Sequence, residues 1–162
     1  MISSEVTCKI SYLHPGMLTR GKKYKVIDIN EDKALIRIVA DNGRTRWFSS
    51  YKFNLEGKEI PMLIDWKFDD NIEQVKRDDY LTWVEVSFNL SDGTKRWCKL
   101  LTPELLSKIL NQPNINSPGW YIPNVILVRS FDIQDVDTVL KELDEDDNLI
   151  DASIELKVDD TE

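Results

Sequence analysis

The residues of this chain that could carry out chemistry are few and widely spaced. His14 is the single histidine, and it precedes Pro15-Gly16, where a turn residue is expected rather than a general base. No serine or cysteine stands in a glycine elbow, and no glycine-rich phosphate loop occurs. One histidine and two distant cysteines, Cys8 and Cys98, are too few for an ordinary zinc site. We therefore expect no catalytic residue, no metal site and no cofactor.

Acidic residues are the remaining candidates for chemistry. Asp144, Asp146 and Asn148 have the spacing of a calcium loop, but a leucine stands where such a loop needs glycine. Further carboxylate pairs occur at Asp69-Asp70 and Asp78-Asp79, and their spacing does not indicate one catalytic pocket. We predict that the carboxylates act collectively, as a surface that attracts a basic protein. The structural alternative is that they only keep the chain soluble.

The charge of the chain changes sign near its middle. Residues 1–60 contain 11 Lys and Arg against 7 Asp and Glu, a net charge of +4. Residues 61–162 contain 10 against 22, a net charge of −12, and the two values sum to the formal −8. A step of this size predicts two domains with different surfaces, which we place at residues 1–58 and 59–162.

Short β-rich runs separated by turn signals predict an all-β first domain. Strands are expected at residues 24–29, 34–40 and 44–48, and Asn42-Gly43 suits a tight hairpin turn. This order resembles the small Src-homology-3-like barrels of bacterial and phage proteins, and the resemblance implies a small β-barrel. The matching residues are Gly21, Tyr24, Val26, Asp41, Asn42, Gly43, Trp47, Phe48 and Phe53.

Basic and aromatic side chains are interleaved in this first domain, and Arg44 and Arg46 are expected on one face of a strand. Such a surface could bind nucleic acid as an alternative function. The structural alternative is that these side chains are solvated strand faces and core, because a net charge of +4 is small for a nucleic-acid binder. The candidate nucleic-acid contacts are Lys22, Lys23, Arg44, Arg46, Trp47 and Tyr51.

The second domain has the pattern β-β-β-α-β-α-β, which predicts an α+β fold with a mixed sheet and two helices on one face. Thr102-Pro103 is a typical helix start, with Thr as the N-cap. The continuous apolar run within residues 120–129 predicts a central strand that is covered on both faces. The other expected strands are residues 62–68, 80–90, 95–101 and 150–156, and the helices follow Thr102 and Asp132.

Residues 81–143 resemble small immunity-protein families that neutralise bacterial polymorphic toxins. The resemblance rests on a hairpin that leads into Thr102-Pro103-x-x-Leu106, and on a hydrophobic strand ending in Phe131-Asp132 before an amphipathic helix. It implies a cytoplasmic, cofactor-free protein that blocks a toxin by binding it. The chain also begins without a leader pattern and contains no apolar run long enough for a membrane span, so we expect a cytoplasmic protein with reduced thiols and no membrane contact.

Tryptophan marks the predicted recognition surface. Trp83 is out of phase with Val84 and Val86, so it is expected on the opposite sheet face together with Glu85. Trp83 and Trp97 either pack against the first domain or form an exposed patch. We predict a non-enzymatic inhibitor or immunity-like factor that binds a basic protein, with a nucleic-acid-associated adaptor as the alternative. The predicted partner-binding residues are Asp69, Asp70, Asp78, Asp79, Trp83, Glu85, Trp97, Asp144, Asp146 and Asp147.

Overall fold

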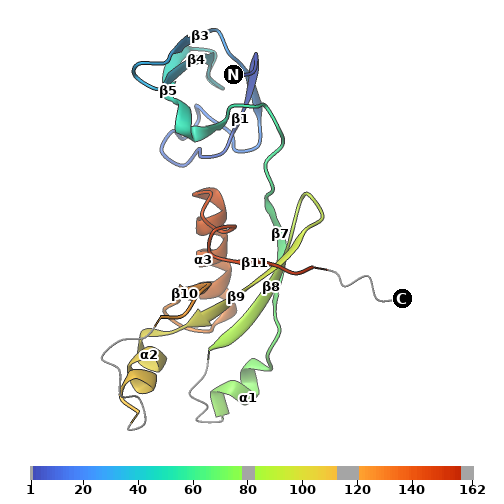
Figure 1. The fold of residues 1–162 in the computed structure, drawn as a ribbon, viewed down its shortest axis with the longest axis vertical. Helices are drawn as coiled ribbons and strands as arrows, with labels where there is room; N and C mark the ends of the chain where they lie inside the picture. The colour runs from blue at the N-terminus through green and yellow to red at the C-terminus, as the bar shows by residue number, and fades with distance from the viewer. Residues whose placement is uncertain (1, 78–82, 113–120, 158–162) are drawn as a thin grey trace. The chain divides into compact units, whose positions relative to one another are not determined.

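The computed structural model describes residues 2–77, 83–112 and 121–157, and these residues form two compact units (Figure 1). The first unit contains Met1–Met62 with Glu145–Asp147, and the second contains Leu63–Asp144 with Asn148–Glu162. The predicted boundary between residues 58 and 59 lies just before this division. Within the described residues, no helix is long and apolar enough to cross a membrane.

The first unit contains two three-stranded antiparallel sheets. The first sheet has the order β2 (Lys23–Lys25), β1 (Glu5–Cys8), β6 (Phe53–Asn54), and the second has β3 (Asp28–Asn30), β4 (Leu35–Val39), β5 (Thr45–Ser49). A 3₁₀ turn, η1 (Ser50–Lys52), leads from β5 to β6. The all-β prediction is therefore right, but the described strands pair as two separate sheets and do not show a closed barrel.

The predicted strand at residues 24–29 is two strands in the structure. Its first part pairs with β1, and the Val26 N–H still donates to the Ser4 carbonyl. The Ile27 N–H instead donates to the Arg37 carbonyl, so the chain changes partner and enters the other sheet. β1 was not predicted, although it supplies Val6 and Cys8 to the core. The core residues of this unit are Val6, Cys8, Leu18, Tyr24, Ile36, Ile38, Ala40, Phe48 and Phe53.

The second unit is built on a mixed five-stranded sheet, as predicted. β10 pairs with β9 in parallel, and the other strand pairs are antiparallel. The main order is β10 (Val125–Leu127), β9 (Lys95–Leu101), β8 (Val84–Leu90), β7 (Leu63–Phe68), and β11 (Ile154–Glu155) also pairs with β9. The helices are α1 (Ile72–Arg77), α2 (Pro103–Leu110) and α3 (Ile133–Glu145).

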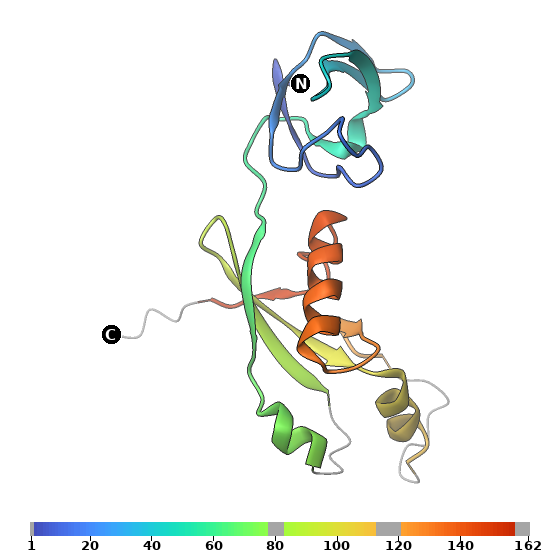
Figure 2. The same ribbon diagram turned by 180° about the vertical axis from the view of Figure 1, so that it is seen from behind.

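One face of this sheet forms the core of the second unit. Figure 2 shows α3 lying across the strands, and its Val136 and Leu140 are fully buried against them. Val84, Val86 and Phe88 of β8 supply the sheet side of this core. Burying such side chains stabilises the fold by about 1.5–3 kcal/mol for each residue.

The predicted strand at residues 120–129 is short and lies at the edge of the main strand order. Trp120 lies outside the described residues, and within residues 121–129 only Val125–Leu127 is a strand, which pairs with β9. Ile126 and Val128 are buried in the core, whereas 57% of Leu127 is exposed. The apolar run predicted a strand covered on both faces because Leu127, which points away from the core, is also apolar. The predicted start of α2 is confirmed, since Thr102 Oγ1 accepts the Leu105 N–H at 3.2 Å.

Candidate functional site

The second face of the five-stranded sheet carries the side chains that alternate with the core residues. Strand register places Glu85 opposite Lys99, and places Trp97 between Ser87 and Ile154 of its two neighbouring strands. Of these side chains, Ser87 and Leu101 are buried, and Leu101 is the neighbour of Leu127 in the register. We call this surface the open face, and its residues are Asp65, Lys67, Trp83, Glu85, Ser87, Asn89, Lys95, Trp97, Lys99, Leu101, Val125, Leu127 and Ile154.

Two tryptophans and a lysine meet near the middle of the open face. The Lys99 Nζ lies 4.5 Å from the centre of the Trp83 ring and 5.6 Å from the centre of the Trp97 ring. Trp97 and Lys99 are two residues apart on β9, and this spacing puts their side chains on the same face. Both ring distances are within the range of cation–π attraction. We call Trp83, Trp97 and Lys99 the aromatic clamp.

Three carboxylates lie beside the aromatic clamp. The Glu85 Oε1 accepts the Trp83 Nε1–H at 3.4 Å, which keeps this carboxylate next to one of the two rings. The Asp70 Oδ2 accepts the Glu85 backbone N–H at 2.7 Å, and the Asp69 Oδ1 accepts the Ser87 hydroxyl at 2.8 Å. We call Asp69, Asp70 and Glu85 the carboxylate rim. Each carboxylate has further lone pairs, so the rim can accept hydrogen bonds from a cationic side chain.

The structure therefore brings five of the predicted partner-binding residues together: Asp69, Asp70, Trp83, Glu85 and Trp97. Lys99 completes this group and was missed as a site residue, although its position beside Trp97 on alternate residues was a usable signal. The predicted residues Asp78 and Asp79 lie outside the described residues.

Three other predicted partner-binding residues do not join this group. Asp144 belongs to the last turn of α3, and Asp146 and Asp147 follow that helix. Because α3 packs on the opposite face of the sheet, Asp144 belongs to a different surface from the carboxylate rim, and Asp146 and Asp147 are part of the first unit. Shared negative charge in the sequence carried no information about which face each residue would occupy.

Lys22 of the predicted nucleic-acid contacts is already engaged within the first unit. Its Nζ lies 2.6 Å from the Asp41 Oδ1, and the Asp41 carboxylate also accepts hydrogen bonds from the hydroxyls of Thr19 and Tyr24. The hydrogen bond from Lys22 is the main reason that the pKa of Asp41 is lowered. Burial raises the pKa of Tyr24 to about 12, so this phenol remains a donor at neutral pH.

Arg44 and Arg46, which were expected on one strand face, lie just before and within β5, and their shared face stays a prediction. Arg44 precedes β5, while Arg46 pairs with Ile38 and alternates with Trp47 along β5. Trp47 instead contacts Arg37 of β4, whose Cζ lies 5.9 Å from its ring centre. The last two candidates lie on other elements, with the exposed Lys23 on β2 and Tyr51 in η1.

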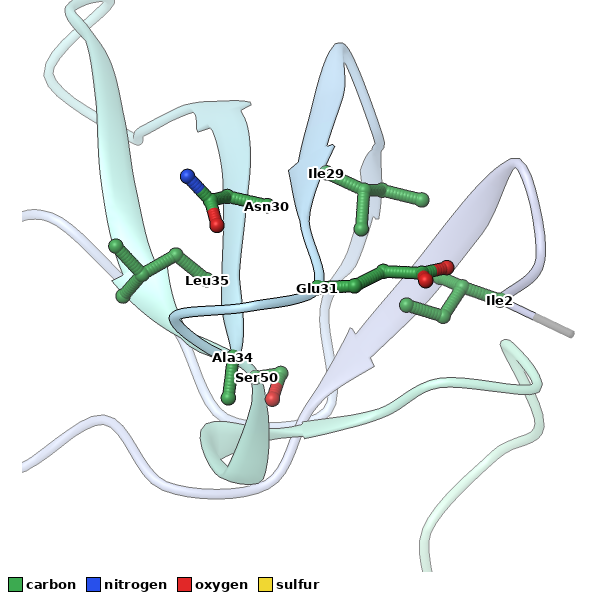
Figure 3. A pocket seen from close by; sticks show the side chains of 7 residues that line it. All are labelled: Ile2, Ile29, Asn30, Glu31, Ala34, Leu35 and Ser50. Carbon is green, nitrogen blue, oxygen red and sulfur yellow. The ribbon is translucent and has the colours of Figure 1, made fainter.

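A small pocket opens in the first unit, with a volume of about 240 Å³ (Figure 3). Its lining comes from the N-terminal segment, from β3, β4 and their connection, and from η1. This volume is below the range of typical small-molecule sites and would hold a single side chain. None of the predicted site residues lines it. The lining residues are Ile2, Ile29, Asn30, Glu31, Ala34, Leu35 and Ser50.

The two cysteines and the histidine occupy structural positions. Both thiols are free and buried, and burial raises the pKa of Cys8 to about 11 and that of Cys98 to about 12. His14 packs edge-to-face against Phe48, with ring centres 5.1 Å apart, and burial lowers its pKa. The raised thiol pKa values make Cys8 and Cys98 poor nucleophiles at neutral pH. Across the described ranges, no group of three or more His, Cys, Asp or Glu residues is placed to hold a metal ion.

Comparison with known proteins adds no relative: no family model, no curated protein and no solved structure matches this chain. The two resemblances described from the sequence therefore stay predictions.

Proposed function

We propose that this protein is a non-enzymatic binding factor that engages a basic protein partner through the open face, as an inhibitor or immunity-like factor would. The observation that carries the proposal is the meeting of Trp83 and Trp97 on one sheet face, around Lys99 and beside the carboxylate rim. Tryptophans are strongly enriched among the residues that dominate binding energy at protein interfaces.

The apolar residues next to the aromatic clamp support an interface rather than isolated surface tryptophans. Ile154 is Trp97's neighbour on β11 and is 41% exposed, and the partly exposed Val125 is Lys99's neighbour on β10. Charged side chains, among them Asp65 and Lys95, lie further out on the same face. An apolar centre inside a polar margin is the usual anatomy of a protein–protein interface.

The charge of the chain supports a basic partner. Residues 61–162 carry a net charge of −12, with 10 Lys and Arg against 22 Asp and Glu. A surface of this sign raises the association rate of a cationic protein, and the effect decreases as salt screens the charges. The carboxylate rim places part of this charge directly beside the aromatic clamp.

The state of the thiols supports a cytoplasmic location for this activity. Cys8 and Cys98 are free, and each is buried in the core of its own unit. Free structural thiols are typical of proteins that work in a reducing compartment.

Binding of nucleic acid by the first unit has weaker support. Lys22 is held by Asp41, and the remaining candidate residues are spread over β2, the start of β5 and η1. A nucleic-acid adaptor would show its strongest binding to RNA or single-stranded DNA at low salt, where phosphate contacts contribute most. A gel-shift titration of the full chain at low salt tests this alternative directly.

The test of the proposed function is affinity capture with the full chain as bait, followed by mass spectrometry of the retained proteins. We expect a basic protein to be retained by the wild type and lost with the double variant Trp83→Ala/Trp97→Ala. Trp47→Ala is the matched control, because Trp47 is a partly exposed tryptophan on the first unit. Retention of the same protein by the double variant, or loss with the Trp47 control alone, would contradict the proposal.

A further inference from the structure

We propose that the aromatic clamp is a receptor for an arginine side chain of the partner protein, and that Lys99 occupies this receptor while no partner is bound. The inference rests on the proposed function and names the residue that the open face recognises. It starts from the position of the Lys99 Nζ near the centres of two tryptophan rings, at 4.5 Å and 5.6 Å.

The two rings form a site that already holds a cation, because the Lys99 Nζ lies beside both of them. A tryptophan face attracts a cation more strongly than any other aromatic side chain, and each contact contributes about 0.5–2 kcal/mol. Trp47, which also has a cation beside it, offers only one ring to Arg37. Two rings around one position are the feature that distinguishes the aromatic clamp from this single contact.

The carboxylate rim gives the site a second preference, for a cation that donates several hydrogen bonds. Glu85 lies directly opposite Lys99 in the strand register, and its Oε1 is held beside the Trp83 ring. The Asp70 Oδ2 accepts the Glu85 backbone N–H at 2.7 Å. A guanidinium can stack on a ring through its plane and donate to carboxylates through its edge, whereas an ammonium cannot combine the two in this way.

Lys99 is a weak occupant of such a site. Its ammonium is a compact and strongly hydrated charge, and its side chain is only half-buried. Leaving the rings returns this ammonium to water at little cost, because cation–π contacts at accessible sites are weak. An incoming arginine therefore competes with a tethered lysine, and removal of the lysine should strengthen arginine binding.

The test is an NMR titration that follows the indole N–H signals of the five tryptophans of the full chain, assigned with Trp→Phe variants. The probes are N-acetyl-arginine methylamide, its lysine counterpart and its uncharged norleucine counterpart, at low salt. We expect arginine to shift the Trp83 and Trp97 signals most, lysine less and norleucine least. The Trp66 and Trp47 signals act as internal controls, and the Trp66 signal also reports that the second unit is folded.

Two lysine variants separate occupation of the site from general charge. Lys99→Ala empties the site, and Lys95→Ala removes the same charge from the same strand and face. We expect Lys99→Ala to tighten arginine binding about fivefold, and Lys95→Ala to change it little. Glu85→Gln should weaken binding about threefold, because a charged acceptor becomes a neutral one.

The outcomes separate this inference from the proposed function. If neither the wild type nor Lys99→Ala responds to arginine more than to norleucine, the arginine receptor is overturned, even if the tryptophan variants still lose the captured protein. If arginine binds but the double tryptophan variant retains the captured protein, the role of the site in partner recognition is overturned. Selective arginine binding together with loss of the captured protein supports both.

Discussion

The two faces of the five-stranded sheet are made by the same strands but differ in burial and composition. On β8, Val84, Val86, Phe88 and Leu90 face α3 and are no more than 2% exposed, while Glu85 and Asn89 between them face outward. The inner face is mostly apolar, with Arg96 opposite Phe88 as a charged exception, and the outer face mixes aromatic, acidic and basic side chains. One strand can therefore hold a stable core with one set of alternate residues and leave the other set for recognition.

The largest expected effect comes from the inner face. Phe88→Ala should lower the free energy of unfolding of the second unit by about 3–5 kcal/mol, because the lost ring leaves a cavity in a fully buried core. Trp97→Ala on the open face should cost about 1 kcal/mol, since its side chain is only half-buried. Urea denaturation followed by circular dichroism measures both, and equal costs would mean that the two faces do not differ as described.

A smaller effect is expected where α3 is attached to β7. The Trp66 Nε1–H donates to the Asp137 Oδ1 at 2.9 Å, and Trp66→Phe removes this bond while keeping an aromatic ring. We expect a loss of about 1 kcal/mol in the free energy of unfolding. The matched change Trp83→Phe on the open face should cost less, because its bond to Glu85 is longer, at 3.4 Å. A larger loss of unfolding free energy for Trp83→Phe than for Trp66→Phe would contradict this prediction.

The same contact predicts a pH dependence. The hydrogen bond from Lys141, and then the one from Trp66, lower the pKa of Asp137 below its ordinary value of 3.8. A depressed folded-state pKa contributes stability that is present above the ordinary pKa and is lost as the pH falls through the folded value. The stability difference between the wild type and Asp137→Asn should therefore be largest at neutral pH and shrink between pH 4 and pH 2.

Urea midpoints measured at pH 7, 4, 3 and 2 check this prediction. Lys141→Met is the companion variant, since removing the ammonium should reduce the same pH-dependent contribution. A difference between wild type and Asp137→Asn that stayed constant down to pH 2 would show that the charge of Asp137 contributes nothing.

The smallest effect on stability is expected from the centre of the open face. Lys99→Met removes the charge from between the two rings but keeps most of the apolar stem, so the unfolding free energy should change by about 0.5 kcal/mol. Differential scanning calorimetry at low salt measures this change. A loss as large as that of Phe88→Ala would mean that Lys99 holds the fold together and is not a replaceable occupant.

The sequence was sufficient for most elements of the second unit and their alternation, although α1 was not among the expected helices and β10 and β11 are shorter than expected. Thr102-Pro103 marked the start of α2, and the alternation around β8 placed Trp83 and Glu85 on the face opposite the core. These features depend on neighbouring residues, and local rules describe them well. The α+β fold with a mixed sheet followed from the order of the elements.

Features that depend on distant partners could not be predicted from the sequence. Lys22 was expected to be available for nucleic acid, but Asp41, which is far along the chain, holds it. Likewise, the hydrogen bonds of Asp69 and Asp70 depend on how β7 pairs with β8, and a charge pattern does not specify that pairing. The split of the strand at residues 24–29 has the same cause, because a continuous pattern does not show a change of pairing partner.

The most direct test of the central claim is isothermal titration calorimetry of the purified captured protein against the wild type and the double variant Trp83→Ala/Trp97→Ala. The claim is that the open face of the second unit is the binding surface. We predict that the double variant keeps its fold by circular dichroism and binds at least about thirtyfold more weakly, as expected when residues that dominate an interface are removed. An affinity within about twofold of the wild type would contradict the claim.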